Sequence, residues 1–234
     1  MKKIRRQLLT ALAAIVAVAT VALLGVGSQA RSDRGQAPPT RPGVVLAQPV
    51  AFAGTVYLTF DDGPHATWTP KVLAILRKYA VRAVFFEIGR NVAAAPAVTR
   101  SLRSSGMLIG NHTWSHPDLT LLSSASVTTE LNRMESALGY RPRCVRPPYG
   151  ATNSRIQAII AARSQRHILW TVDPRDWSRP GTTTIVNRVL AGVRDGARVL
   201  LHDGGGDRSQ TVAALDLLVP QLRARGFVLG LMAC

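Results

Sequence analysis

Two histidines four residues apart, His112 and His116 in the run His-Thr-Trp-Ser-His, form the first pattern in this chain with a clear chemical meaning. Two imidazoles spaced i and i+4 lie on the same side of a helical turn and can ligate one metal ion. Thr113 stands where the His-Glu-x-x-His metalloproteases carry their general base, so a base has to come from another segment. Taken alone, the pair fits two surface or core histidines equally well.

Two adjacent carboxylates, Asp61 and Asp62, end an apolar run and are followed by Gly63-Pro64. A turn at that point leaves both side chains at the mouth of a strand. Adjacent residues of an extended chain point in opposite directions, so one carboxylate can bind a metal while the other approaches the metal-bound water. Asp-Asp-Gly alone is usually a turn. With the histidine pair it predicts a His-His-Asp site with open positions, which is typical of a catalytic metal.

Three further polar residues follow other apolar runs. His202 comes directly after Val199-Leu200-Leu201 and is a candidate general acid. Arg146 in Arg-Pro-Pro-Tyr-Gly and Asp176 in Asp-Pro-Arg-Asp-Trp carry charges that could orient Asp61 and His202 respectively. Each of the three also has a plainer interpretation, as a structural histidine or as a partner in a surface salt bridge.

These residues need a scaffold that gathers distant segments, and strand-like and helix-like segments alternate along the chain. Strands are expected at Thr55–Phe60, Ala83–Ile88, Leu108–Asn111, Arg143–Arg146, His167–Val172, Arg198–Leu201 and Phe227–Met232. Apolar residues at helical spacing predict helices over Pro70–Tyr79 and Ser126–Leu138. Apolar strands separated by helices indicate parallel pairing and an α/β fold in the form of a closed barrel, although the seven strands are one fewer than in a complete eight-stranded barrel. In such barrels the active site lies at the carboxyl ends of the strands, where the candidate residues fall.

Five short motifs also occur in a characteristic order. They are Thr59-Phe60-Asp61-Asp62-Gly63-Pro64, His112-Thr113-Trp114-Ser115-His116, Arg146-Pro147-Pro148-Tyr149, Asp173-Pro174-Arg175-Asp176-Trp177 and Leu200-Leu201-His202. In these motifs the chain resembles the polysaccharide deacetylases with a NodB homology domain, carbohydrate esterase family four, from about residue 55 to residue 234. Five ordered motifs are far more specific than any one of them.

The resemblance implies a deformed (β/α) barrel of about seven parallel strands and a role for each motif residue. In this comparison Asp61 resembles the general base, and Arg146 resembles the residue that holds the base. Asp62, His112 and His116 resemble the ligands of a divalent metal that is expected to be zinc. His202 resembles the general acid and Asp176 the residue that tunes it, while the Tyr149 backbone N–H resembles the oxyanion donor and Trp177 and Leu200 resemble the lining of an acetyl-methyl pocket. The expected activity is removal of N-acetyl groups from N-acetylglucosamine-containing polysaccharide, such as peptidoglycan, chitin or a related glycan. The alternatives are an O-acetyl xylan esterase and a non-catalytic exported glycan-binding protein.

The net charge and the N-terminal sequence indicate where the protein is located. The excess of 29 Lys plus Arg over 13 Asp plus Glu favours an anionic wall as neighbour, and no nucleic-acid module is recognisable. A basic start, a long apolar run and a small-x-Ala ending predict a signal peptide or an N-terminal membrane anchor over residues 1–30. A flexible linker is expected over residues 31–50 and a catalytic domain over residues 51–234. The protein is therefore expected to be a secreted or membrane-anchored extracytoplasmic monomer, in which Cys144 and Cys234 form either a disulfide or two free thiols.

Overall fold

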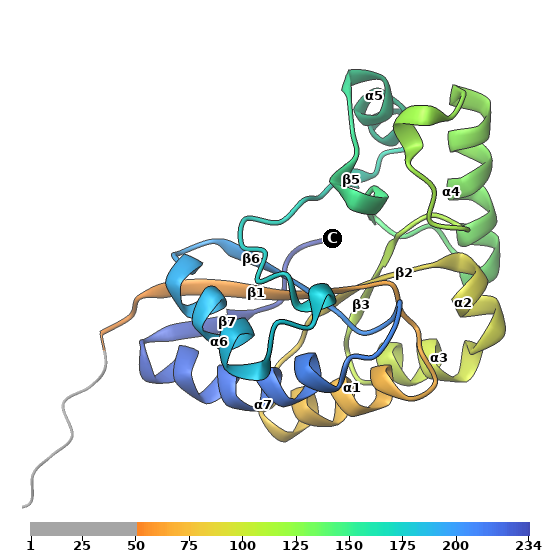
Figure 1. Ribbon diagram of the computed structural model, residues 1–234. Coiled ribbons are helices and arrows are strands. Elements are labelled where there is room, and N and C mark those ends of the chain that lie inside the picture. Colours follow the sequence, from red (N-terminus) through yellow and green to blue (C-terminus); the bar gives the residue numbers. More distant parts are fainter. Residues whose placement is uncertain (1–50) are drawn as a thin grey trace, which may run out of the picture. The chain divides into compact units, whose positions relative to one another are not determined.

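A curved sheet of seven parallel strands forms the centre of residues 51–234, the part of the chain that the computed structural model describes (Figure 1). The strands are β1 (Gly54–Asp61), β2 (Val84–Glu87), β3 (Leu108–Asn111), β4 (Cys144–Val145), β5 (Arg166–His167), β6 (Ala197–His202) and β7 (Phe227–Gly230). The order is β5-β4-β3-β2-β1-β6, and β7 also pairs with β1. The predicted α/β class is confirmed, but the barrel is not closed, because the end strands β5 and β6 do not pair and the sheet curls into a half-barrel.

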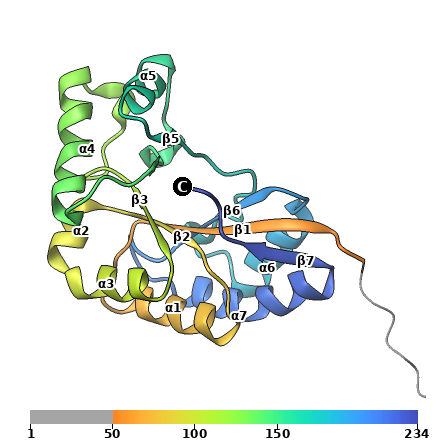
Figure 2. The same cartoon turned by 180° about the vertical axis from the view of Figure 1, so that it is seen from behind.

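The helices connect successive strands and cover the sheet. They are α1 (Trp68–Lys78), α2 (Gly89–Ala94), α3 (Pro96–Ser104), α4 (Ser124–Leu138), α5 (Ser154–Ala162), α6 (Thr182–Gly192) and α7 (Ser209–Ala224), with short 3₁₀ turns η1 (Leu119–Leu121), η2 (Pro148–Gly150) and η3 (Asp176–Ser178). Figures 1 and 2 show α1, α3, α6 and α7 along one face of the sheet, while α4 and α5 lie together at the end of the sheet that carries β5. The two helices predicted from apolar spacing are confirmed as α1 and α4, each within two residues at either end.

Strand β1 is the longest strand and pairs with three others, β2, β6 and β7. One of its edges pairs with β6 from Val56 to Asp61. The other edge is shared, because β7 pairs with its first half and β2 with its second half. This arrangement brings the ends of β1, β6 and β2 to one edge of the sheet, where Asp61 lies directly across from His202.

The fifth strand differs from the expectation of His167–Val172. Only Arg166 and His167 pair with β4, and the chain then leaves the sheet. It returns at Val172, which bridges to Val199 of β6. The segment between His167 and Val172 therefore crosses from one end of the open sheet to the other, and a residue cannot keep its pairing with β4 while the chain makes that crossing. The strands expected at Arg143–Arg146 and Phe227–Met232 are likewise shorter, at Cys144–Val145 and Phe227–Gly230.

The C-terminal segment lies against the inner side of the curved sheet (Figure 2). Met232 is buried with Val84 and Phe86, which point to this side of β2. Cys234 forms a disulfide with Cys144 of β4, with 5.1 Å between the two Cα atoms. Of the two states that the sequence left open for the cysteines, the structure has the disulfide.

The predicted signal peptide or anchor at residues 1–30 and the predicted linker at residues 31–50 lie outside the described residues. Within residues 51–234, no helix combines the length and the apolar character needed to cross a membrane.

Candidate active site

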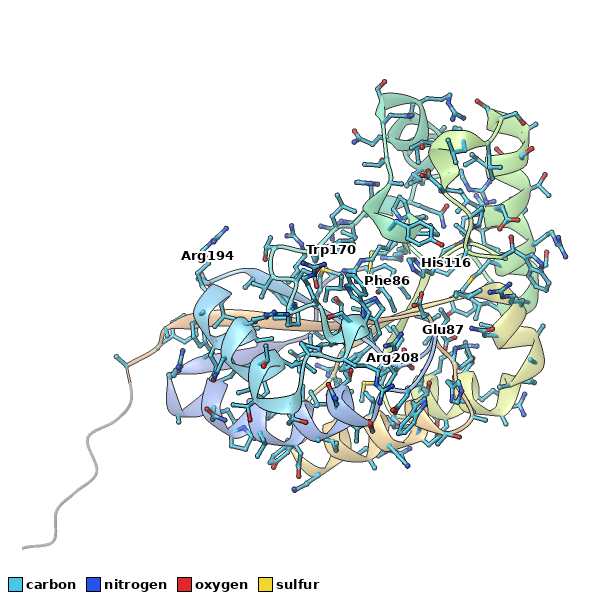
Figure 3. All side chains as sticks on the ribbon, in the orientation of Figure 1. Phe86, Glu87, His116, Trp170, Arg194 and Arg208 are labelled. Carbon is cyan, nitrogen blue, oxygen red and sulfur yellow. A yellow bond between two sulfur atoms is a disulfide. The ribbon has the colours of Figure 1, made fainter. Side chains whose placement is uncertain are left out.

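The predicted site residues come together at the carboxyl ends of the strands, around a pocket of about 430 Å³. Eight of the ten line the pocket, namely Asp61, Asp62, His112, His116, Tyr149, Trp177, Leu200 and His202. Arg146 and Asp176 lie behind its wall, each hydrogen-bonded to a residue that lines it. Figure 3 shows Phe86, His116 and Trp170 toward the carboxyl end of β1, whereas Arg194 lies toward its other end.

Three of these residues form a group that could hold a metal ion. Asp62 Oδ1 lies 3.2 Å from His116 Nε2 and 3.5 Å from His112 Nε2, and one ligand atom of each residue lies within 4.8 Å of the others. His112 Nδ1 lies 2.7 Å from the carbonyl oxygen of Arg146, which assigns the ring proton to Nδ1 and leaves Nε2 bare. Asp62 Oδ1 is buried without a hydrogen bond in the described part of the chain. A bare nitrogen facing an unsatisfied carboxylate oxygen fits a cation between them.

The two imidazoles also act on the ionisation of Asp62. Burial raises the pKa of its carboxyl, but the contacts with His112 and His116 outweigh burial and hold this pKa well below its usual range. Asp62 is therefore ionised at neutral pH, as a metal ligand has to be. The second oxygen, Oδ2, packs against Gly205, where an added Cβ would lie 2.7 Å from it.

The histidine pair does not lie on a helical turn, which corrects the expectation from its spacing. The N–H of His112 continues the strand ladder and donates to the Glu87 carbonyl at 3.1 Å. The next residues form a loop in which Thr113 and His116 have positive φ values of 68° and 66°. The carbonyls of Thr113 and Trp114 accept hydrogen bonds from the start of α2 instead of bonding within a turn. This loop brings the two imidazole centroids to 4.9 Å.

Asp61 is held by a buried arginine. Arg146 is fully buried, and its Nη1 donates to Asp61 Oδ1 at 2.7 Å and to Thr59 Oγ1 at 3.0 Å. The guanidinium carbon lies 4.0 Å from the centroid of the Phe86 ring, and this cation–π contact stabilises the positive charge of Arg146. The other oxygen, Asp61 Oδ2, lies 3.7 Å from His112 Nε2. One oxygen of Asp61 is thus fixed, and the other faces the metal-binding group.

His202 is paired with Asp176. Its Nδ1 lies 2.7 Å from Asp176 Oδ1, and its backbone N–H donates to Asp176 Oδ2 at 2.9 Å. Thr211 Oγ1 donates to the same Oδ2 at 2.7 Å. Burial lowers the pKa of His202, but the hydrogen bond and charge of Asp176 outweigh it, with smaller contributions from Asp61 and Asp62, so the pKa is raised. The arrangement favours a protonated imidazole at the pocket.

Aromatic side chains form the mouth of the pocket. Tyr149 is 70% exposed, adopts a positive φ of 61°, and places its hydroxyl 3.1 Å from His116 Nδ1. Trp177 is 46% exposed, while Leu200 is buried. Trp170 and Asp173 also line the pocket, although no role there was predicted for them from the sequence. Trp170 falls inside the expected fifth strand, and only the crossing of that segment turns it to the site.

A further residue near the site, which no sequence pattern indicated, is Glu130 of α4. Its carboxylate accepts hydrogen bonds from Trp114 and Ser115, in the loop between the two histidines. A single glutamate on an amphipathic helix carries no signal that distinguishes it from one facing solvent.

Comparisons with known proteins agree with this geometry. A family model described as polysaccharide deacetylase matches residues 52–166. The chain is 38% identical over 191 residues to a chitooligosaccharide deacetylase from Azorhizobium caulinodans, a match that covers 75% of this chain and 91% of that protein. It is 39% identical over 179 residues to a peptidoglycan-N-acetylglucosamine deacetylase from Bacillus cereus, covering 74% of this chain and 83% of that protein.

Among solved structures, the chain is similar to the crystal structure of the Bc1960 peptidoglycan N-acetylglucosamine deacetylase bound to a naphthalenyl N-hydroxybenzamide. The TM-score is 0.75 at 34% identity, and the match covers 79% of this chain and 88% of that one. The fold and site define a carbohydrate-active hydrolase of the α/β class, and the chain belongs to the polysaccharide deacetylase family. This family depends on a metal ion, and Asp62, His112 and His116 form the possible metal-binding group of the described residues.

Proposed function

We propose that this protein is a metal-dependent hydrolase that removes N-acetyl groups from N-acetylglucosamine-containing polysaccharide, such as peptidoglycan, chitin or a related glycan. The observation that supports this most is the meeting of three arrangements at one pocket. These are the metal-binding group, the Asp61–Arg146 pair and the His202–Asp176 pair. Similar proteins deacetylate chitooligosaccharides and peptidoglycan N-acetylglucosamine, which supports the same bond type here.

In the proposed mechanism, Asp62, His112 and His116 hold a zinc ion. Two imidazoles and one carboxylate are a ligand set that suits zinc and leaves a position open for catalysis. When bound, such an ion polarises the acetyl carbonyl and lowers the pKa of a water toward ~7. All the remaining chemistry comes from side chains and backbone groups around the pocket.

Asp61 acts as the general base. Arg146 holds its Oδ1, so Oδ2 is left to take the proton from the attacking water. The backbone N–H of Tyr149 donates to the oxyanion that develops on the acetyl oxygen, a contribution that is often the largest single one in such reactions. The mechanism requires this N–H to point into the pocket when substrate is bound.

His202 acts as the general acid. Asp176 keeps the proton on Nδ1 and raises the pKa of the ring, so that Nε2 can give a proton to the leaving nitrogen. Trp177 and Leu200 line the pocket and contact the methyl group of the acetyl. Acetate and a free amino sugar are the products.

The natural substrate and location are part of the same proposal. The formal net charge of +16 favours attraction to an anionic wall, which supports peptidoglycan as substrate over a neutral polymer. The basic and apolar start of the sequence supports export, with the enzyme secreted or held by an N-terminal anchor. We propose that it acts as an extracytoplasmic monomer.

The decisive experiment measures acetate release by the full chain with zinc. The substrates are peptidoglycan, chitin oligomers and acetylated xylan, and Asp61→Asn serves as the matched control because it keeps the size of the side chain. We expect release from the two N-acetylated substrates and a loss of about 10²–10⁴-fold in the variant. Release only from xylan would favour the O-acetyl esterase. No release from any substrate, or equal release by Asp61→Asn, would contradict the proposed activity and mechanism.

A further inference from the structure

We propose that Glu130 is a positioning residue for the metal site, acting through the loop that joins the two histidine ligands. The inference rests on the proposed function, since it takes Asp62, His112 and His116 as the ligands. Glu130 does not line the pocket and forms no hydrogen bond or ion pair with any of the three. Its effect on the site therefore has to pass through the backbone of residues 113–116.

The contacts of Glu130 with this loop are direct and nearly saturate its carboxylate. Oε2 accepts from the backbone N–H of Trp114 at 3.0 Å and from that of Ser115 at 2.8 Å. Oε1 accepts from Ser115 Oγ at 2.9 Å. Three bonds to an ionised acceptor are stronger than bonds to a neutral one. They clamp the two residues that immediately precede His116.

The loop needs such a clamp because its shape is not one the chain adopts by itself. Thr113 and His116 both have positive φ, a conformation that side chains with a Cβ rarely adopt. The N–H of Thr113 is held by the Asn111 side chain, and the N–H of His116 by Thr113 Oγ1. Without Glu130, the N–H groups of Trp114 and Ser115 lose their partners, and the loop can relax toward more ordinary backbone angles. His116 would then no longer face Asp62.

Helix α4 is fixed relative to the same loop by a second, independent contact. Asn111 Nδ2, at the end of β3, donates to the backbone carbonyl of Leu131 at 3.1 Å. This hydrogen bond fixes α4 relative to β3 at Leu131, the residue that follows Glu130. Glu130 forms no ion pair within residues 51–234, so its carboxylate is not engaged in a competing role.

The same helix offers a matched control in Glu135. Glu135 is buried, whereas Glu130 is half-buried, and the Glu135 carboxylate also makes three contacts, with Arg141 at 2.9 Å, Arg163 at 2.9 Å and Gln165 at 3.1 Å. None of these partners belongs to the metal-binding loop. A change at Glu135 thus removes as many hydrogen bonds from α4, at a more buried position, without affecting the bonds of residues 113–116.

The test measures the zinc dissociation constant of the metal-free full chain by competition with a chromogenic chelator. The proteins are the wild type, Glu130→Ala, Glu130→Gln, Glu135→Ala and, as a check on the ligands, Asp62→Ala. We expect Glu130→Ala to weaken zinc binding by about 10–100-fold. Glu130→Gln keeps one acceptor oxygen and should weaken it less, while Glu135→Ala should bind zinc within about twofold of the wild type.

The outcomes separate this inference from the proposed function. Wild-type affinity in both Glu130 variants would overturn the role of Glu130 while leaving the metal site intact. If Glu135→Ala weakens zinc binding as much as Glu130→Ala does, Glu130 contributes only to general stability, and the proposed positioning role is overturned as well. Should Glu130→Ala fail to fold, Glu130→Gln decides the matter by the same criterion. A wild type that binds no zinc, or an unchanged Asp62→Ala, would refute the proposed metal site itself.

Discussion

Replacing Asp176 by asparagine tests how the site keeps His202 ready to donate a proton. Asn has the same shape, but an NH₂ group replaces one carboxylate oxygen. Because Oδ2 accepts from two donors, the N–H of His202 and Thr211 Oγ1, the amide oxygen is expected to take that position. The NH₂ group then faces His202 Nδ1 and donates to it. The ring is forced into the neutral form with its only proton on Nε2, which is a poor acid.

The expected loss follows from the role of a general acid. Such a group contributes about 10²–10⁴-fold to the rate, which corresponds to about 3–5.5 kcal/mol of activation free energy. Asp176 is also the main influence that raises the pKa of His202 against burial. In the variant the lowering effect of burial is offset less, so the pKa of His202 falls. Activity that depends on protonated His202 should then be lost at a lower pH than in the wild type.

The pH dependence of thermal stability provides a second test of the His202–Asp176 pair, because its direction can be predicted. The pKa of His202 is raised in the folded protein. The His202–Asp176 pair therefore contributes its full stabilisation at pH values below the unfolded-state pKa of about 6.5. That contribution is lost as the pH rises through the folded pKa. The difference in Tm between wild type and Asp176→Asn should therefore be larger near pH ~6 than near pH ~9.

The assay is acetate release from chitin oligomers as a function of pH, with thermal unfolding followed at the same pH values. Rates within about threefold of the wild type, together with an unshifted alkaline limb, would refute the assignment of His202 as an acid tuned by Asp176.

Three further predictions concern the metal, the charge and the disulfide. Asp62→Ala and His112→Ala should lose zinc in elemental analysis while Asp61→Asn retains it; equal zinc content in all three would remove the ligand assignment. Turnover of peptidoglycan should fall as salt rises from about 0.01 to 0.15 M, because the Debye length shrinks from about 30 to 8 Å, whereas turnover of neutral chitin oligomers should change little; equal salt sensitivity would argue against steering by charge. Cys144→Ser should lower the free energy of unfolding in urea by about 2–5 kcal/mol, and adding Cys234→Ser should cost little more; two reactive thiols in the denatured, unreduced wild type would contradict the crosslink.

The sequence was sufficient to predict most of the residues that line the pocket, although not Trp170 or Asp173. Asp61, His112 and His202 each stand at the end of an apolar run, and parallel strands bring their carboxyl ends to one edge. That rule needs only local signals, namely the apolar run and the polar residue after it. The parallel α/β arrangement follows from the same runs because helices separate them.

Features that depend on distant partners were not predictable in this way. The spacing of His112 and His116 matched a helical turn, yet the loop between them is shaped by the start of α2 and by Glu130. The apolar stretch after His167 resembled a strand, but the sheet is open at that point and the chain has to cross it. In both cases local periodicity is overruled by contacts with elements far away in the sequence.

The position of β1 has a consequence for how the molecule is made. Its partners β6 and β7 are the last strands of the chain, and Thr59 bonds to Val199, 140 residues later. Until those strands leave the ribosome, one edge of β1 has no neighbour at all, and contacts this distant form slowly. We therefore expect the nascent polypeptide to stay without its final shape until synthesis is nearly complete. Any premature stop before β6 should give an insoluble product rather than a smaller working domain.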